Sequence, residues 1–417
     1  MATGVSKTKW NGQIDKSASS SDALDFNGFR QVWPLAETKS SNRLYFGDNL
    51  YVLKKLSEDP KIRGNVRLVY IDPPYSTNSV FQTRTLENGY ADLLVGDEYL
   101  SFLKERLVLL RDLLADDGSI YVHLDENMAF HAKVILDSVF GKGNFKNFIV
   151  RQKCRPKNFT KKSFGNIADY ILFYTKTDKT VWNKPHEAWT EEKILKEYSF
   201  IEPETGRRYK RVPLHAPGTR NGETGKPWKG MLPPAGKHWQ FIPSKLDQFD
   251  KQGKIYWSKN GNPRRKVYLD ESRGLSIQDI WSDFLDANNQ NDKITGYPTE
   301  KNVNLLKRII AASSNEGDLV LDCFVGSGTT LEAAARLKRN WIGIDIEKVA
   351  METILKRFAH GTQKMGDYVQ KENISQRPLF ESEFSGRITD FALISEKDRV
   401  NELNGILQKW NGWINSK

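Results

Sequence analysis

The sequence predicts an α/β protein built on a parallel, doubly wound sheet with helices on both faces. Short apolar segments typical of buried strands alternate with segments of helical spacing over residues 41–175, and again over residues 290–360. Between them, from 176 to 289, this alternation stops, Gly and Pro become frequent, and six of the eleven tryptophans occur. We therefore expect one α/β domain in two parts, interrupted by an inserted domain of strands and loops.

The first part contains both kinds of expected element. Residues 67–72 form a largely apolar run that ends at two prolines, as expected for a strand buried on both faces. Residues 99–114 carry apolar side chains at helical spacing and end near Asp117-Gly118, which is a helix stop. By the same criteria, further strands are expected at 43–48, 119–124, 147–152 and 169–174, and further helices at 49–56 and 127–140.

The second part is expected to contain strands at 318–322 and 340–346 and helices at 303–313 and 330–337. Residues 1–40 and 361–417 show no clear periodicity, and we expect them to be N-terminal and C-terminal extensions. The predicted domain limits are therefore 1–40, 41–175, 176–289, 290–360 and 361–417.

The composition favours a globular protein with a polyanionic partner. The 417 residues include 63 Lys and Arg against 52 Asp and Glu, for a formal charge of +11. This charge suggests a polyanion such as nucleic acid, and a basic enzyme with a small substrate is the alternative. Cys154 and Cys323 are too far apart for a zinc motif or a disulfide framework, so a reducing cytoplasmic location is expected. No signal-peptide pattern and no run of 18 apolar residues occurs, so no membrane association is expected.

Residues 322–330 have the features of a nucleotide-binding turn. Gly326 and Gly328 allow a sharp turn before a helix N-terminus, and Asp345 ends the next strand, where a carboxylate can accept hydrogen bonds from ribose hydroxyls. Leu331 stands where a dinucleotide motif has its third glycine, and the lysine of a phosphate-binding loop is absent from this turn. A nucleoside cofactor without a pyrophosphate fits better. The alternative is a tight turn that binds no ligand.

A second turn, Asp72-Pro73-Pro74-Tyr75, suits an amino group on a planar ring. The prolines fix the backbone and donate no hydrogen bond, so they present bare carbonyl acceptors. The Asp72 carboxylate and the Pro73 carbonyl could together accept two hydrogen bonds from an amino group, and Tyr75 could stack on a base. If the substrate is DNA, that base would have to leave the duplex.

These two turns together resemble the catalytic and cofactor motifs of the amino-methyltransferases of restriction–modification systems. The catalytic match is Asp72-Pro73-Pro74-Tyr75 and the cofactor match is residues 324–328. Residues 47–49, 296–301 and 343–345 fit the same family. The catalytic motif precedes the cofactor motif, as in the β class of these enzymes, and the resemblance covers residues 41–175 and 290–360.

The resemblance implies a circularly permuted, Rossmann-like methyltransferase sheet. The strand before Asp48 should lie beside the strand ending in Asp345, and the strands ending in Asp72 and Asp322 should be neighbours. The implied cofactor is S-adenosyl-L-methionine, with Asp345 on its ribose and Asp48 near its adenine ring. Further cofactor contacts are expected from Asn49, Thr299, Lys301, Asp322, Phe324, Gly326, Ser327, Gly328, Thr329 and Thr330.

The implied reaction is site-specific transfer of a methyl group to N6 of a flipped-out adenine in double-stranded DNA. Asp72 favours adenine, because relatives that methylate N4 of cytosine more often have Ser at this position. N4-cytosine methylation and a catalytically degenerate DNA-binding subunit are the alternatives. A cognate restriction endonuclease and a second copy of the chain are further partners that the resemblance allows.

Basic residues in two regions are candidates for DNA contacts. Residues 151–162 carry six basic residues and no acid, and the candidates there are Arg151, Lys153, Arg155 and Lys157. Basic and aromatic residues also alternate in the inserted domain, which the resemblance makes a target-recognition domain. Its candidates are Arg207, Arg208, Lys226, Trp228, Lys229, Arg264 and Arg265. No metal-ligand spacing occurs, so no metal is expected.

Overall fold

The computed structural model describes residues 25–26, 28–35, 38, 40–74, 80–82, 88–91, 97–156, 162–286, 293–295, 297, 300–364 and 386–415. The chain forms two compact units. The main unit comprises Met1–Asn183 and Gln278–Lys417, and the inserted unit is Lys184–Ile277. The inserted unit is shorter than the expected 176–289, because the flanking segments pair with the main sheet and its helices: Lys176 N–H donates to the Gly118 carbonyl and Asn183 N–H to the Ala312 carbonyl.

The main unit is built on an eleven-stranded mixed sheet. Its strands, in spatial order, are β1 (Asp25–Phe26), β2 (Phe29–Trp33), β23 (Ala392–Glu396), β3 (Arg43–Phe46), β21 (Asn340–Asp345), β20 (Leu319–Asp322), β4 (Val66–Ile71), β7 (Leu114–Leu124), β9 (Ala168–Thr175), β8 (Phe145–Gln152) and β18 (Ile280–Trp281). The strands from β23 to β7 run parallel, and β2 and β9 are antiparallel to their neighbours on either side of this block.

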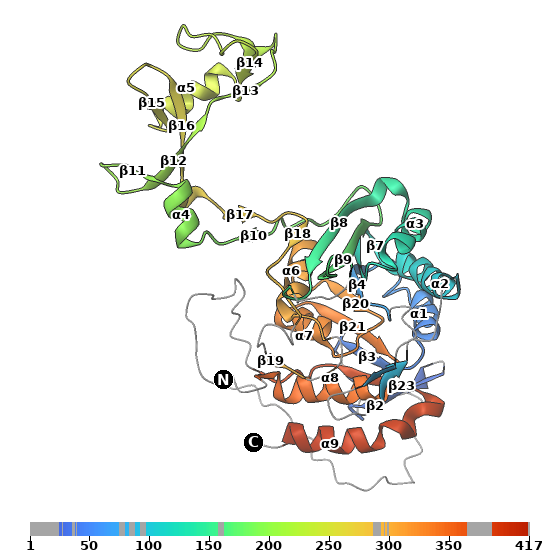
Figure 1. The fold of residues 1–417 in the computed structure, drawn as a ribbon. Helices are drawn as coiled ribbons and strands as arrows, with labels where there is room; N and C mark the ends of the chain where they lie inside the picture. The colour runs from blue at the N-terminus through green and yellow to red at the C-terminus, as the bar shows by residue number, and fades with distance from the viewer. Residues whose placement is uncertain are drawn as a thin grey trace. The chain divides into compact units, whose positions relative to one another are not determined.

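Helices cover both faces of this sheet (Figure 1). On one side lie α1 (Asn49–Glu58), α2 (Asp97–Leu113) and α3 (Ala129–Phe140), and on the other lie α6 (Val303–Ser313) and α7 (Thr329–Arg336). The helix α8 (Lys348–His360) packs beside α7. Because both faces are covered, the central strands are apolar along their length, and Leu68, Val69 and Ile71 of β4 are fully buried.

The predicted α/β fold and its permuted strand order are confirmed. β3, which precedes Asp48, pairs with β21, which ends in Asp345, although they are far apart in the chain. β4, which precedes Asp72, pairs with β20, which ends in Asp322. The carboxyl ends of these four parallel strands therefore meet at one edge of the sheet.

The expectation of two patternless extensions was wrong where the structure describes them. Residues 29–33 form β2 and residues 392–396 form β23, and these two strands extend the sheet beyond β3. The helix α9 (Asn404–Asn415) then places Trp410 in edge contact with Trp33 and near Phe391. These strands are short, and each pairs with a partner that is distant in the sequence.

The inserted unit has its own small core. A four-stranded antiparallel sheet consists of β11 (Phe200–Ile201), β12 (Arg208–Pro213), β16 (Pro263–Tyr268) and β15 (Ile255–Trp257). With it are the pair β13 (His215–Pro217) and β14 (Lys237–Trp239), the pair β10 (His186–Glu187) and β17 (Leu275–Ser276), and the helices α4 (Glu191–Glu197) and α5 (Pro243–Lys251). The core consists of Leu214, Trp228, Trp239, Leu246 and Ile255.

Two short strand pairs complete the main unit: β5 (Val80–Gln82) with β6 (Asn88–Ala91), and β19 (Lys293–Ile294) with β22 (Gln363–Lys364). Among the described helices of the whole chain, none is long and apolar enough to cross a membrane.

Candidate active site

A cavity of about 280 Å³ lies at the carboxyl ends of β3, β21, β20 and β4. This is the edge at which an open α/β sheet binds its ligands. The cavity brings together most of the residues predicted from the two motifs. Those that line it are Asp48, Asn49, Asp72, Pro73, Pro74, Lys301, Asp322, Phe324, Gly326, Ser327, Thr329, Thr330 and Asp345.

Two of the predicted residues, Tyr75 and Thr299, lie outside the described residues. A third, Gly328, does not line the cavity. Gly328 is the N-cap of α7 with φ 78°, and a Cβ on it would lie 2.9 Å from the Ile354 side chain. Gly328 therefore serves the turn and the packing of α7 against α8.

Asp345 joins two of the turns that form the cavity. Its Oδ2 accepts a hydrogen bond from the Gly326 N–H at 2.8 Å, and its Oδ1 accepts one from the Glu347 N–H at 2.9 Å. Gly326 has φ 51°, a conformation that favours glycine. The carboxylate thus fixes the glycine turn after β20 against the end of β21.

Two carboxyl groups of the cavity have raised pKa values. Burial raises the pKa of Asp322 to about 7 and that of Asp345 to about 6, although backbone N–H donors act in the opposite direction in both cases. Asp72 and Asp345 also raise the pKa of Asp322 through their negative charges. Such a cavity favours a cationic ligand, because positive charge would offset the repulsion between these carboxylates. The sulfonium and ammonium groups of S-adenosylmethionine, the cofactor that the resemblance implies, meet this requirement.

The turn after β3 is held largely by bonds within the protein. Asp48 accepts a hydrogen bond from the Tyr51 N–H at the start of α1. Asn49 Nδ2 donates to the Cys323 carbonyl at 2.8 Å, while Asn49 Oδ1 accepts from Arg106 Nε at 2.6 Å. Asn49 therefore ties the β3 turn to the β20 turn, a role that its position in the motif did not indicate.

Lys301 is paired with the predicted catalytic acid. Its Nζ lies 2.8 Å from Asp72 Oδ2. Burial would lower the pKa of Lys301, but the negative charges of Asp72, Asp169 and Asp286 raise it, so the side chain is an ammonium ion. The resemblance predicted Lys301 as a cofactor contact. It lines the cavity, and it also forms an ion pair with Asp72.

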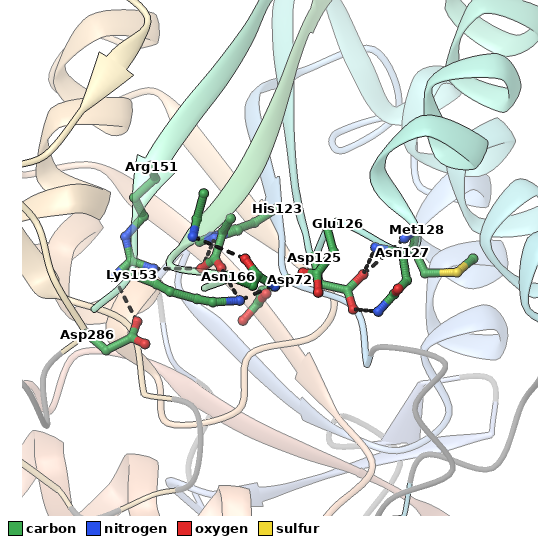
Figure 2. A network of polar contacts seen from close by, with 12 residues as sticks. Asp72, His123, Asp125, Glu126, Asn127, Met128, Arg151, Lys153, Asn166 and Asp286 are labelled. Carbon is green, nitrogen blue, oxygen red and sulfur yellow. Dashed lines mark hydrogen bonds and ion pairs between the residues drawn. The ribbon is translucent and has the colours of Figure 1, made fainter. Parts of the chain in front are cut away.

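Buried polar contacts around His123 lie close to this pair (Figure 2). Tyr70 Oη is 2.8 Å from His123 Nδ1, and His123 Nε2 is 3.0 Å from Asp169 Oδ2. Burial lowers the pKa of His123, so the ring is neutral, and the carboxylate requires the proton to be on Nε2. Nδ1 is then an acceptor, and Tyr70 donates to it. These contacts fix Tyr70, two residues before Asp72.

Arg151 belongs to the same network, and its prediction as a DNA contact was wrong. The residue is fully buried; Nη1 lies 2.9 Å from Asp169 Oδ2, Nη2 lies 2.8 Å from Asp286 Oδ1, and Nε donates to the Phe284 carbonyl. Lys153 is partly buried and lies 3.3 Å from Asp169 Oδ1 (Figure 2). The basic run at 151–162 therefore begins on the inward face of a strand. Arg155 is exposed, and Lys157 lies outside the described residues.

The candidates in the inserted unit fall into two groups. Trp228 is buried, its Nε1 donates to Asp247, and it stacks on Trp257, so it belongs to the core and does not contact bases. Five basic candidates already contact other groups of the protein. These residues, with their partners in parentheses, are Arg207 (Asp270 and Glu271), Arg208 (Tyr198 carbonyl), Lys226 (Glu223), Lys229 (Asp250) and Arg265 (the Phe241 and Phe249 rings).

Arg264 differs from these candidates. It is exposed on β16, and together with the exposed Lys237 it lowers the pKa of His215, after the larger effect of burial. Lys237 and Arg264 therefore form a positive cluster beside His215 on the inserted unit.

The chain belongs to the DNA methylase family, whose model matches residues 66–356. It is 49% identical over 340 residues to the Type II methyltransferase M.EcaI of Enterobacter cloacae, covering 81% of this chain and 74% of that protein. It is 28% identical to the Type III restriction-modification enzyme StyLTI Mod subunit of Salmonella typhimurium, covering 82% of this chain and 58% of that one. Among solved structures, the M1.HpyAVI–SAM complex is 18% identical with a TM-score of 0.41, covering 76% of this chain and 98% of the other. The protein is a DNA methyltransferase that uses S-adenosylmethionine.

Proposed function

We propose that this DNA methyltransferase modifies N6 of adenine at a specific sequence in double-stranded DNA. The observation that carries the proposal is the position of Asp72 and Pro73 at the edge of the same cavity as Asp322 and Asp345. The Asp72 carboxylate supports adenine over cytosine, because relatives that modify N4 of cytosine more often have Ser at that place.

The exocyclic amino group of adenine is a weak nucleophile because its lone pair is delocalised into the ring. We propose that the Asp72 carboxylate and the Pro73 carbonyl accept hydrogen bonds from the two N–H groups of this nitrogen. These contacts strengthen as the nitrogen becomes positively charged, so they stabilise the transition state more than the bound substrate. S-adenosylmethionine supplies a methyl group already activated by its sulfonium.

The reaction then needs alignment more than acid–base catalysis. The N6 lone pair forms a bond to the methyl carbon as the carbon–sulfur bond breaks, and the cationic nitrogen then loses its proton to Asp72 or to water. Lys301 would hold the carboxylate in place during these steps. Asp345 would accept from the ribose hydroxyls, and Phe324 with the 326–330 turn would hold the methionine part.

We further propose that the inserted unit is the target-recognition domain and that the enzyme is the modification component of a restriction–modification system. The StyLTI Mod relative carries that description in its name. A cognate endonuclease and a homodimer belong to the same proposal. Light scattering of the purified protein would test the dimer, with a monomer mass at micromolar concentration counting against it.

The modified base can be identified directly. Purified protein is incubated with plasmid DNA and isotopically labelled S-adenosylmethionine, and the DNA is hydrolysed and analysed by mass spectrometry. Labelled N6-methyldeoxyadenosine is expected. Labelled N4-methyldeoxycytidine would replace the proposal by its main alternative, and no label in DNA would support a degenerate subunit. Sequencing of methylated DNA would then give the recognition site.

A further inference from the structure

The C-terminal segment reaches the edge of the sheet at which the cavity lies. β23 runs parallel to β3, with Ser395 opposite Phe46, so the two strands end together. A 3-10 helix, Lys397–Leu403, follows immediately. Both elements lie outside residues 66–356, the part of the chain that matches the family model.

Glu396 contacts the turn that follows β3. Its Oε1 accepts a hydrogen bond from the Asp48 N–H at 2.8 Å. A Cβ on Gly47 would lie 2.5 Å from this same oxygen, so only glycine leaves room for the carboxylate. Gly47 N–H in turn donates to the Asp345 carbonyl at 3.0 Å. One carboxylate from the C-terminal segment therefore fixes the backbone that carries Asp48 and Asn49 into the cavity.

Arg399 contacts the turn that follows β21. Its Nη2 donates to the Ile346 carbonyl at 3.0 Å, and its guanidinium lies over the Phe46 ring, 4.1 Å from the centroid. Glu402 holds the guanidinium through contacts of 2.8 and 3.0 Å. Ile346 and its neighbour Glu347 line the cavity. Arg399 thus supports a second wall of the cavity, next to the one that Glu396 supports.

We propose that Glu396 and Arg399 are positioning residues for S-adenosylmethionine. Together they hold the turns after β3 and β21 at a fixed separation, and neither residue lines the cavity itself. This inference rests on the assignment of the cavity to S-adenosylmethionine. It adds to the cofactor site a segment that carries no methyltransferase motif.

The proposal predicts that substitutions of these residues weaken cofactor binding and leave the chemical step unchanged. Without the Glu396 carboxylate, the Asp48 N–H loses its acceptor and the turn after β3 is no longer fixed. The Asp72 turn follows β4, which β3, β21 and β20 separate from β23 in the sheet, so catalysis by the loaded enzyme should be spared. Changes should therefore appear in the cofactor KM and Kd and not in kcat.

The test uses the full chain with three substitutions and one matched control. The substitutions are Glu396→Ala, Glu396→Gln and Arg399→Met. The control is Lys409→Ala in α9 of the same segment, which removes an exposed ion pair with Glu352 of α8, away from the cavity. Calorimetry gives the Kd for S-adenosylmethionine, steady-state kinetics give KM and kcat, and circular dichroism verifies folding.

We expect Glu396→Ala and Arg399→Met to weaken cofactor binding about tenfold, with kcat within about twofold of the parent protein. Glu396→Gln keeps an amide oxygen that can accept from Asp48 N–H, so most of the affinity should return. Lys409→Ala should match the parent protein. If Glu396→Ala does not fold, the cofactor affinities of Arg399→Met and Glu396→Gln test the positioning role.

Asp345→Asn separates this inference from the cavity assignment beneath it. If Asp345→Asn loses affinity while Glu396→Ala and Arg399→Met bind normally, the positioning role is wrong and the cofactor site stands. If Asp345→Asn also binds normally, the cavity assignment itself is wrong. A fall in kcat with unchanged KM in the Glu396 and Arg399 variants would also overturn the inference.

Discussion

Lys301 Nζ lies 2.8 Å from Asp72 Oδ2, at the edge of the cavity that we assign to the cofactor. The two residues are far apart in the chain, and both have little exposed side-chain surface, 10% for Lys301 and 18% for Asp72. An ion pair so shielded from water resists screening by salt and fixes the direction of the carboxylate. We therefore assign Lys301 to the positioning of Asp72.

Replacing Lys301 by Met should lower kcat by about tenfold to a hundredfold, because the carboxylate loses the partner that orients it. The Kd for S-adenosylmethionine should change much less, since Asp345 and the 326–330 turn remain. Single-turnover methylation and calorimetry measure the two effects separately. A large loss of affinity with normal single-turnover rates would return Lys301 to the role of a cofactor contact.

Lys301→Arg is the matched control for charge. It keeps a cation beside Asp72 but changes its length and shape, so activity should lie between the parent protein and Lys301→Met. Equal activities of the Arg and Met variants would mean that the geometry of the ammonium, and not its charge, is what matters.

Asp72→Ala should reduce methylation by at least about a hundredfold, because it removes an acceptor that contacts the reacting nitrogen. Cofactor affinity should be largely retained. The measurement is transfer of labelled methyl groups to plasmid DNA alongside calorimetry with S-adenosylmethionine. Near-normal turnover in this variant would refute the catalytic assignment of the Asp72-Pro73-Pro74 turn.

The raised pKa of Asp322 predicts a pH dependence of stability. Its pKa is about 7 in the folded protein against 3.8 as the ordinary value. Between these values the folded state holds a proton that the unfolded state has released, so this residue's contribution to stability falls as pH rises through the window. Asp322→Asn lacks this contribution. The free energy of unfolding of Asp322→Asn, taken relative to that of the parent protein, should therefore rise as the pH increases from about 5 to about 8.

Urea unfolding of the cofactor-free protein at both pH values measures this difference. Asp345→Asn should show the same sign over a narrower window, because the pKa of Asp345 is about 6. Asp178→Asn, an exposed substitution, serves as the control for removing one carboxylate. A difference between Asp322→Asn and the parent protein that does not change with pH would show that Asp322 is ionised throughout.

The sequence predicted the part of the site that local motifs specify. Asp322, Gly326 and Asp345 follow apolar strands at recognisable spacing, and the permuted order of the motifs placed β3 beside β21 correctly. These features are local: a strand, a turn and a helix start can be identified within a short stretch of chain. The resemblance supplied the pairing that local patterns could not.

The sequence did not reveal contacts between distant segments. Arg151 stands in a basic run, but alternate residues of a strand face inward, and this one meets Asp169 and Asp286. Glu396 stands in a tail without a motif, and only the pairing of β23 with β3 brings it to Asp48. A buried ion pair and a carboxylate on a backbone N–H leave no local signature, because their partners come from elsewhere in the chain.

The positive cluster on the inserted unit gives the last prediction. Arg207 is neutralised by Asp270 and Glu271, whereas Arg264 and Lys237 are exposed, and within the described part of the chain no ion pair is found for either. Charges without a protein partner are those that can release counterions from DNA phosphates. Arg264→Ala should therefore weaken DNA binding by about threefold to tenfold. It should also reduce the slope of log affinity against log salt concentration by about one.

Arg207→Ala removes a positive charge that is already paired, so it should change neither quantity appreciably. Fluorescence anisotropy with duplex DNA over a salt series measures both. If the double variant Lys237→Ala, Arg264→Ala kept the parent affinity and salt slope, phosphate contacts would have to come from other surfaces of the chain.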